Sequence, residues 1–315
     1  MTAEESRNAA SLDYRDMLRI RLMEEEVMRC VQDGRITGST HLCIGQEAIP
    51  VGVCRALDPR DPVVATYRGH GWALAKGVSP VQLAAEVMGR DSELNGGRGG
   101  SAYLSAPAHA FMGENSIVGA GVPVTLGLAM AHQRRATGLV PAVSIGDGAM
   151  NQGNVHEALN MGSVLGVPFI VVVENNGYVE MTTSDLLTAV PAAARAAAYA
   201  MRAIEVDGND PSAVADAARE ARAFALAESR PVMLEAHTKR LGGHYSGDAQ
   251  MYRPAGELDL WRAFDPLPKC RALLDPADAE EIETAVATEV AESFRRAAEM
   301  PFPSASEVMA HVRAH

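Results

Sequence analysis

Cysteines, long apolar runs and positive charge are scarce in this sequence, and each scarcity excludes a class of protein. The four cysteines show neither CxxC spacing nor a dense framework, which indicates reduced thiols and predicts a cytoplasmic protein. No apolar run approaches the roughly 20 residues of a membrane-spanning helix. The first ten residues lack the apolar core of a signal peptide and the Arg-rich bias of a transit peptide. We therefore expect no membrane partner.

The charge balance is acidic, with a formal net charge of −12 at pH 7. This balance argues against nucleic acid or an anionic membrane as the main partner. An anionic ligand would need a local positive site within this field, so individual arginines become informative. The composition is otherwise that of a soluble globular protein, with 47% hydrophobic and 22% charged residues.

Strands and helices alternate regularly in the second half of the chain. Apolar runs and turn signals predict strands at 141–145, 168–173, 202–206 and 231–236, separated by helices at 154–165, 191–200 and 211–228. Such alternation implies a mostly parallel α/β sheet covered on both faces. Asn154 and Glu157 resemble a capping box for the helix that they begin.

Helices are also expected at the two ends of the chain. Their predicted ranges are 11–33 with Ser11 as its cap, 46–56, 81–88 and 123–137, and a helical tail from about 250 that ends in the amphipathic stretch 276–299. Residues 89–121 are glycine-rich and read as a long loop, which is usually functional or mobile. One domain over residues 1–315 is the simplest division.

Two polar loops follow two of the predicted strands. Gly146-Asp147-Gly148 ends one strand, and Asn175-Asn176-Gly177 ends the next. The carboxyl ends of neighbouring parallel strands face one crevice, so an acid and an amide would meet there. Oxygen donors of this kind suit magnesium completed by phosphate oxygens. Gly-Asp-Gly alone is more often a plain turn, and the pair of loops makes the magnesium-diphosphate interpretation specific.

Three histidine-bearing segments could serve such a ligand. Tyr67-Arg68-Gly69-His70-Gly71 reads either as a polar turn or as a diphosphate clamp, with His70 facing the reacting end. The glycines around His244 suggest a mobile loop over a site, although a surface loop uses the same residues. His41 is a third general acid or base candidate, and a structural hydrogen bond is its alternative role.

Other motifs are weaker. Val118-Gly119-Ala120-Gly121-Val122-Pro123 fails the dinucleotide fingerprint, because Val124 stands where the third glycine belongs. Close backbone packing at a helix start explains it better. No nucleophile elbow and no zinc spacing of His and Cys is present.

Together these motifs resemble the alpha subunits of the first component of 2-oxo acid and acetoin dehydrogenase complexes, which are thiamine diphosphate enzymes. The likeness covers roughly residues 12–265 and rests on HLCIGQEA, TYRGHG, GGRGGS, SIVGAGVP, GDGAMNQG, VVVENNGY and GHYSGD. It implies a doubly wound, thiamine diphosphate-binding α/β fold in an α2β2 heterotetramer with a beta subunit. It also implies transfer of the acyl unit to a lipoyl-bearing acyltransferase component.

The resemblance also implies roles for individual residues. Magnesium would be held by Asp147, the Asn176 side chain and the Tyr178 carbonyl. The diphosphate would contact the backbone of Gly148 and Ala149, beside Gly146, with Tyr67 and Arg68 next to them. Ser116 and Val118 would touch the aminopyrimidine ring, His244 would lie near the diphosphate and the reacting centre, and His41 would lie on the substrate side. His70 stays a catalytic candidate from its place beside Arg68.

Three departures from the family pattern bear on substrate and regulation. Ala102-Tyr103 replaces a common Met-His, Ser116 replaces a common glycine, and Tyr245 stands where mitochondrial members carry a regulatory serine. The segments around Arg68 and from Gly243 onward look closer to acetoin members, with a pyruvate or branched-chain 2-oxo acid dehydrogenase as the alternative. A nucleotide-dependent redox domain or a non-catalytic diphosphate-binding subunit is less favoured. The family's activating glutamate belongs to the beta subunit, so this chain is expected to be half an active site.

Overall fold

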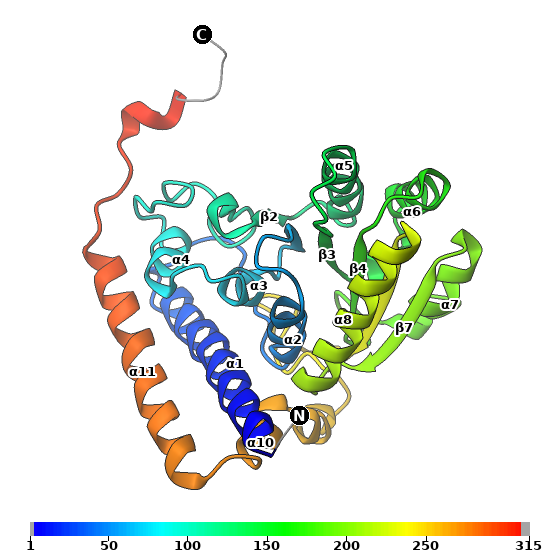
Figure 1. Cartoon of the computed structure of the whole chain (residues 1–315). Coiled ribbons are helices and arrows are strands. Elements are labelled where there is room, and N and C mark those ends of the chain that lie inside the picture. Colours follow the sequence, from blue (N-terminus) through cyan, green and yellow to red (C-terminus); the bar gives the residue numbers. More distant parts are fainter. Residues whose placement is uncertain (1–2, 310–315) are drawn as a thin grey trace.

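The computed structural model of the protein describes residues 3–309, and a six-stranded sheet forms its centre (Figure 1). Every neighbouring pair in the sheet is parallel, which confirms the predicted parallel α/β sheet. In spatial order the strands are β2 (Phe111–Asn115), β1 (Val63–Thr66), β3 (Ala142–Gly146), β4 (Ile170–Asn175), β8 (Val232–His237) and β7 (Arg202–Asp207).

Helices cover both faces of this sheet, so the fold is doubly wound. One face packs against α1 (Ala3–Gln32), α2 (Ala48–Ala56), α3 (His70–Ala75), α4 (Pro80–Val87) and α8 (Pro211–Glu228). The other packs against α5 (Gly121–Arg134), α6 (Gly153–Leu165) and α7 (Ala192–Ala196). Alternate side chains of β4 divide between the two cores, since Val172 joins the first and Val171 and Val173 join the second.

A helical tail completes the chain, as the sequence predicts. It contains α9 (Glu257–Trp261), α10 (Pro266–Arg271) and α11 (Pro276–Glu299). The last helix lies alongside α1 (Figure 1), where Tyr14 Oη donates to Glu283 Oε1 at 2.6 Å and Arg19 Nε to Glu289 Oε2 at 2.8 Å. Within residues 3–309 no helix is long and apolar enough to cross a membrane.

Short elements fill the connections. A two-stranded antiparallel hairpin joins β5 (Tyr178–Val179) to β6 (Thr182–Thr183). Single 3₁₀ turns cover Pro107–His109, Asp147–Asn151, Ser184–Leu186, Ala197–Tyr199, Arg262–Phe264 and Ala305–Met309. The hairpin follows the asparagine loop directly, so it helps to shape the crevice above β4.

Two predicted helix caps are wrong. The first helix begins at Ala3, and Ser11 lies inside it with its hydroxyl donating to the Arg7 carbonyl at 3.1 Å. The capping box at Asn154 and Glu157 does not form, because α6 begins at Gly153 after Gln152. Asn154 Oδ1 is instead buried without a hydrogen-bond partner. Packing against neighbouring elements therefore sets these ends rather than local capping.

The predicted long loop at 89–121 is partly wrong, since it contains β2, and its glycine-rich part is tightly held. Glu86, at the end of α4, is fully buried and accepts backbone N–H groups of Asn95 at 3.0 Å, Gly97 at 3.0 Å and Gly99 at 2.6 Å. Its carboxylate also accepts from Gly100 N and Ser92 Oγ. Converging N–H groups of this kind form an anion-binding nest, here filled by the chain's own carboxylate.

We expect Glu86→Gln to loosen this loop. Its amide nitrogen would face backbone N–H groups that donate hydrogen bonds to a carboxylate oxygen in the wild type. Hydrogen bonds to charged groups contribute about 1.5–3 kcal/mol, and the free energy of unfolding should fall by about that amount in urea denaturation. Glu93→Gln is the matched control, since that carboxylate is exposed on the same loop. Equal stability of the two variants would contradict the anchoring role of Glu86.

Candidate functional site

A cavity of about 410 Å³ opens at the carboxyl ends of β1, β3 and β4. Apart from His70, every residue to which the sequence analysis gives a catalytic, cofactor or metal role lines it: His41, Tyr67, Arg68, Ser116, Val118, Gly146, Asp147, Gly148, Ala149, Asn176, Tyr178 and His244. Gln46, Glu174 and Arg240 also line the cavity, and sequence reasoning missed all three. The polar loops that follow β3 and β4 therefore do meet in space.

The two loops meet because their strands pair in register. Gly146 lies opposite Glu174, so Asp147 and Asn176 leave the sheet at the same edge. Burial raises the pKa of Asp147, an effect that the Ser184 hydroxyl on Oδ2 partly offsets. Asn176 donates from Nδ2 to Gln46 Oε1 at 2.9 Å and accepts from Tyr178 N at 3.1 Å. The three oxygen donors proposed for a metal thus come from two adjacent loops.

The cavity has room for a ligand against bare backbone. Nothing lies within 4 Å of the position that a Cβ on Gly146 would take, so this backbone is open to the cavity. At Gly148 a Cβ would stand 2.5 Å from Val179 Cγ1, so any side chain there would push the hairpin away. The glycines are therefore needed for the floor of the cavity and for its packing.

Two buried arginines face the cavity without a carboxylate partner among the described residues. Arg68 donates to the carbonyls of Leu42 and, at 2.9 Å, of His244. Arg240 is 1% exposed, donates to Tyr252 Oη at 2.8 Å and has no partner at Nε. Burial, together with the nearby Arg68 charge, lowers the pKa of Arg240 to about 10. Unpaired buried cations of this kind suit an anionic ligand.

Arg240 could have been found from the sequence. It follows the end of β8 by three residues and precedes His244 by four, so it belongs to the same strand-end edge as the two polar loops. A search for polar residues just after strand ends would include Arg240 once cations are counted together with acids and amides.

His41 and His244 lie side by side in the cavity. Their ring centroids are 4.9 Å apart, and Tyr67 lies 4.4 Å from His41. Burial lowers the pKa of His41 to about 3 and that of His244 to about 4, and Arg68 adds to both shifts. His41 Nδ1 has no partner. Both rings are therefore neutral at pH 7, each with a nitrogen able to accept or donate.

The segment that carries His244 is fixed at several points. Asp248 Oδ2 accepts from His244 N at 2.6 Å and from Tyr252 Oη at 2.7 Å. Arg253 Nη2 donates to the carbonyls of Arg240 and Gly242 at 3.0 and 2.9 Å. The loop around His244 is thus held against the cavity by hydrogen bonds within residues 240–253.

His70 lies outside the residues that line the cavity. Its Nδ1 is 2.8 Å from Glu24 Oε2 on α1, and its Nε2 is 2.9 Å from Ser101 Oγ on the glycine-rich loop. Burial lowers the pKa of His70, but the Glu24 carboxylate outweighs burial and raises it to about 9. A charged imidazolium at the start of α3 therefore joins three segments behind the cavity wall.

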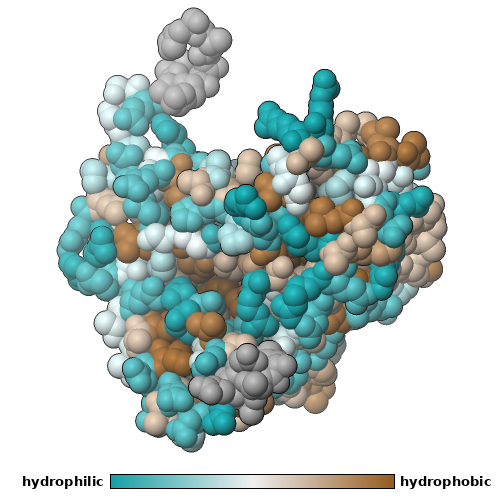
Figure 2. Space-filling view, viewed as in Figure 1, coloured by the Kyte–Doolittle hydropathy of each residue, from teal (hydrophilic) through white to brown (hydrophobic). Residues whose placement is uncertain are grey.

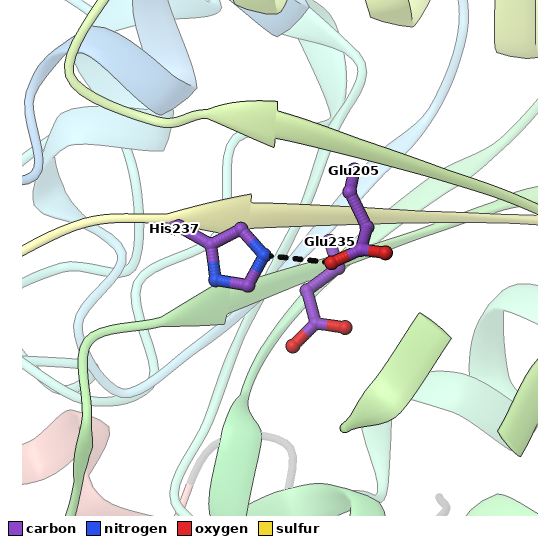
Figure 3. Close-up of side chains that lie close together, drawn as sticks. All are labelled: Glu205, Glu235 and His237. Atoms are coloured by element: carbon purple, nitrogen blue, oxygen red, sulfur yellow. Dashed lines mark hydrogen bonds and ion pairs between the residues drawn. The ribbon is translucent and has the colours of Figure 1, made fainter. Parts of the chain in front are cut away.

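A second cluster of ionisable groups lies on β7 and β8 (Figure 3). His237 Nε2 pairs with Glu205 Oε2 at 3.0 Å, and the Glu235 carboxylate points away from that pair (Figure 3). Glu235 instead accepts from Asn175 Nδ2 at 2.7 Å and from Ala193 N at 2.6 Å. Both Glu235 oxygens are thus used within the chain, and Glu235 anchors the start of the asparagine loop.

A parallel α/β sheet with oxygen donors, open glycine backbone and unpaired arginines at its carboxyl edge suits a phosphorylated cofactor. Comparison with known proteins names the class more closely. Residues 15–306 match the family described as Dehydrogenase E1 component, and the chain belongs to that family, whose members are thiamine diphosphate-dependent subunits.

Several relatives cover most of the chain. It is 41% identical to the alpha subunit of acetoin:2,6-dichlorophenolindophenol oxidoreductase from Cupriavidus necator, over 84% of this chain and 82% of that protein. It is 39% identical to the pyruvate dehydrogenase E1 component subunit alpha of Zymomonas mobilis, over 95% and 87%. The alpha subunit of the acetoin enzyme of Bacillus subtilis is 36% identical, over 95% and 92%.

The environments of the three histidines predict separate titrations in the ligand-free protein. His41 and His244 should stay neutral above pH 6, with pKa values of about 3 and about 4. His70 should keep its proton up to about pH 9. Because that pKa lies above the ordinary 6.5, its contribution to stability is fully present below about pH 6.5 and is lost as pH rises through about 9.

Nuclear magnetic resonance of ¹⁵N-histidine protein measures these pKa values, and single His→Gln variants assign the signals. A signal from His41 or His244 that titrates near 6.5 would mean that water reaches the ring and that burial in the cavity is incomplete.

Proposed function

We propose that this chain is the alpha subunit of a thiamine diphosphate- and magnesium-dependent E1 component that cleaves acetoin and passes the acyl unit to a lipoyl acceptor. One observation carries the proposal most. Asp147 and Asn176 follow neighbouring in-register strands, and Arg68 and Arg240 face the same cavity. Hard oxygen donors beside unpaired guanidinium groups suit a magnesium-diphosphate group.

The residues present fit that group. Asp147, Asn176 Oδ1 and the Tyr178 carbonyl would hold the metal, and the open backbone at Gly146, with Gly148 and Ala149, would lie along the diphosphate. Ser116 and Val118, on the opposite wall, would contact the aminopyrimidine ring. When bound, thiamine diphosphate supplies a carbanion that adds to a carbonyl and then acts as an electron sink.

The protein's own part is to bind, orient and exchange protons. Arg68 and Arg240 neutralise the charged end of the cofactor. His41 and His244 are neutral and adjacent, so either can accept a proton from a substrate hydroxyl or hydrogen-bond to its oxygen. His70 would act behind this wall, by holding α3 and the glycine-rich loop in place rather than by touching the substrate.

A beta subunit would complete the site. Ile117 and Val118 at the cavity are 64% and 40% exposed, and Met161, Val164 and Leu165 leave an apolar strip on α6. Figure 2 shows apolar atoms on the end of the molecule where Figure 1 places α6. Exposed apolar patches of this kind mark protein interfaces. The family resemblance places the glutamate that activates the pyrimidine ring on the beta subunit.

Sequence identity favours acetoin over pyruvate by a small margin: one acetoin enzyme subunit reaches 41% and another 36%, against 39% and 37% for two pyruvate dehydrogenase subunits. The motif around Arg68-Gly69-His70-Gly71 points the same way. A pyruvate or branched-chain 2-oxo acid dehydrogenase is the second candidate, because its alpha subunit would use the same cofactor residues.

Asp147→Ala should abolish cofactor binding. We expect the affinity for thiamine diphosphate in the presence of Mg²⁺ to fall more than about 100-fold, since even groups behind metal ligands contribute 10–100-fold. Isothermal titration calorimetry on the chain assembled with its beta subunit measures this affinity. Asp185→Asn is the control, because that carboxylate is exposed on the loop beside Ser184. Unchanged affinity in Asp147→Ala would refute the metal assignment.

Turnover should require the beta subunit. The chain is to be purified alone and after co-expression with the product of the adjacent gene, and reduction of 2,6-dichlorophenolindophenol measured with acetoin, pyruvate and branched 2-oxo acids. We expect no turnover from the chain alone and the highest kcat/KM of the complex with acetoin. Substantial activity of the isolated chain would contradict a shared active site, and a preference for pyruvate would select the second candidate.

A further inference from the structure

We propose that Gln46 and Glu174 set the direction of the Asn176 amide, so that its oxygen rather than its nitrogen faces the metal. The inference rests on the proposed function, because it concerns the residue proposed as a magnesium ligand. It assigns a positioning role to two residues that the family resemblance does not mention. Neither of them would touch the metal.

A chain of hydrogen bonds runs from the core to the metal ligand. Glu174 Oε1 accepts from Trp72 Nε1 at 2.8 Å and from the Ser144 hydroxyl. Glu174 Oε2 accepts from Gln46 Nε2 at 2.7 Å. Gln46 Oε1 then accepts from Asn176 Nδ2 at 2.9 Å. Trp72, Gln46, Glu174 and Asn176 are all at most 6% exposed, so these bonds lie within the wall of the cavity.

The polarity of this chain follows from the chemistry of its members. Burial raises the pKa of Glu174, and the hydrogen bonds from Ser144, Trp72 and Gln46 counter that rise by favouring the ionised form. The Trp72 indole only donates and the ionised carboxylate only accepts, so Glu174 accepts at its Gln46 side as well. Gln46 must then turn its NH₂ group toward Glu174 and its oxygen toward Asn176. Asn176 in turn must donate from Nδ2, which leaves Oδ1 on the other side.

The backbone favours the same direction for Asn176. Its Oδ1 accepts from Tyr178 N at 3.1 Å, and a reversed amide would place two donors face to face there. A neutral Gln46–Asn176 pair could hydrogen-bond in either direction, whereas the carboxylate of Glu174 permits only one. Magnesium binds amide oxygen and not amide nitrogen, so this direction decides whether Asn176 can be a ligand.

The test reverses the polarity and then restores it. In Glu174→Gln the new side chain still accepts from Trp72 and Ser144, so its NH₂ group faces Gln46. Gln46 must then flip or clash, and Asn176 is turned away from the metal. In the double variant Gln46→Glu/Glu174→Gln the amide at 174 donates to the carboxylate at 46. That carboxylate again accepts from Asn176, so the original direction returns.

The readout is the Mg²⁺ dissociation constant at saturating thiamine diphosphate, measured by calorimetry on the full chain assembled with its beta subunit. We expect binding roughly 10- to 100-fold weaker in Glu174→Gln, and a return to within a few-fold of the wild type in the double variant. Gln46→Met keeps the length of the side chain and removes its polarity, so binding should weaken several-fold. Glu86→Gln is the control, since it also neutralises a buried carboxylate and should keep wild-type Mg²⁺ affinity.

Each outcome separates this inference from the proposed function. Absence of Mg²⁺-dependent cofactor binding in the wild type would refute the proposed function. With wild-type binding present, unchanged affinity in Glu174→Gln and Gln46→Met would overturn the positioning role. A folded double variant that binds as weakly as Glu174→Gln would overturn it too, because a packing role alone predicts additive losses. If Glu174→Gln fails to fold, Gln46→Met and the double variant decide the question.

Discussion

The in-register parallel pairing of β3 with β4 is the constraint on which the site depends. Both strands are almost entirely buried, and their side chains divide between the two cores. A shift by one residue would move every one of these side chains to the wrong face. Apolar packing on both faces therefore fixes where each strand ends. Since the strand ends are fixed, Asp147 of one loop and Asn176 of the next reach the same cavity without a hydrogen bond between them.

The same cavity concentrates charge that the protein does not balance by itself. Arg68 and Arg240 have no salt bridge to a carboxylate within residues 3–309, and their field contributes to keeping His41 and His244 neutral. A buried cation without a partner is costly. A bound diphosphate would offset that cost, so cofactor binding and the stability of the fold are coupled by mass action.

The sequence predicted the elements whose signals are local. The strands at β3, β4, β7 and β8 and the long helices follow from apolar periodicity, and the polar residues after β3 and β4 located the cavity. By contrast, β1 is four residues long, and β2 contains Gly113 at a φ of 129° followed by Glu114. Such strands form because neighbouring strands supply their hydrogen bonds, which a single sequence does not display.

Some side-chain roles could likewise be predicted from the sequence, and others could not. The residues of the two loops could be placed from their position at strand ends. His70 could not, because its partners Glu24 and Ser101 are 46 and 31 residues away in the chain. Gln46 and Glu174 were missed for the same reason, since they are 128 residues apart. Glu174 also ends an apolar run, where a buried carboxylate is unusual without a partner.

Glu86 and Glu174 show how a carboxylate can be buried without a cationic partner. Neither has a salt bridge in the described part of the chain, and each is surrounded by N–H and O–H donors. A salt bridge balances charge but tolerates many geometries. A carboxylate surrounded by donors is more restrictive, because it only accepts and every neighbour must turn a hydrogen toward it. At Glu86 this restriction shapes a glycine-rich loop that has little other reason to hold one conformation. At Glu174 the same restriction would set the direction of the Gln46 amide and, through it, of the Asn176 amide, whose oxygen would then face the proposed metal.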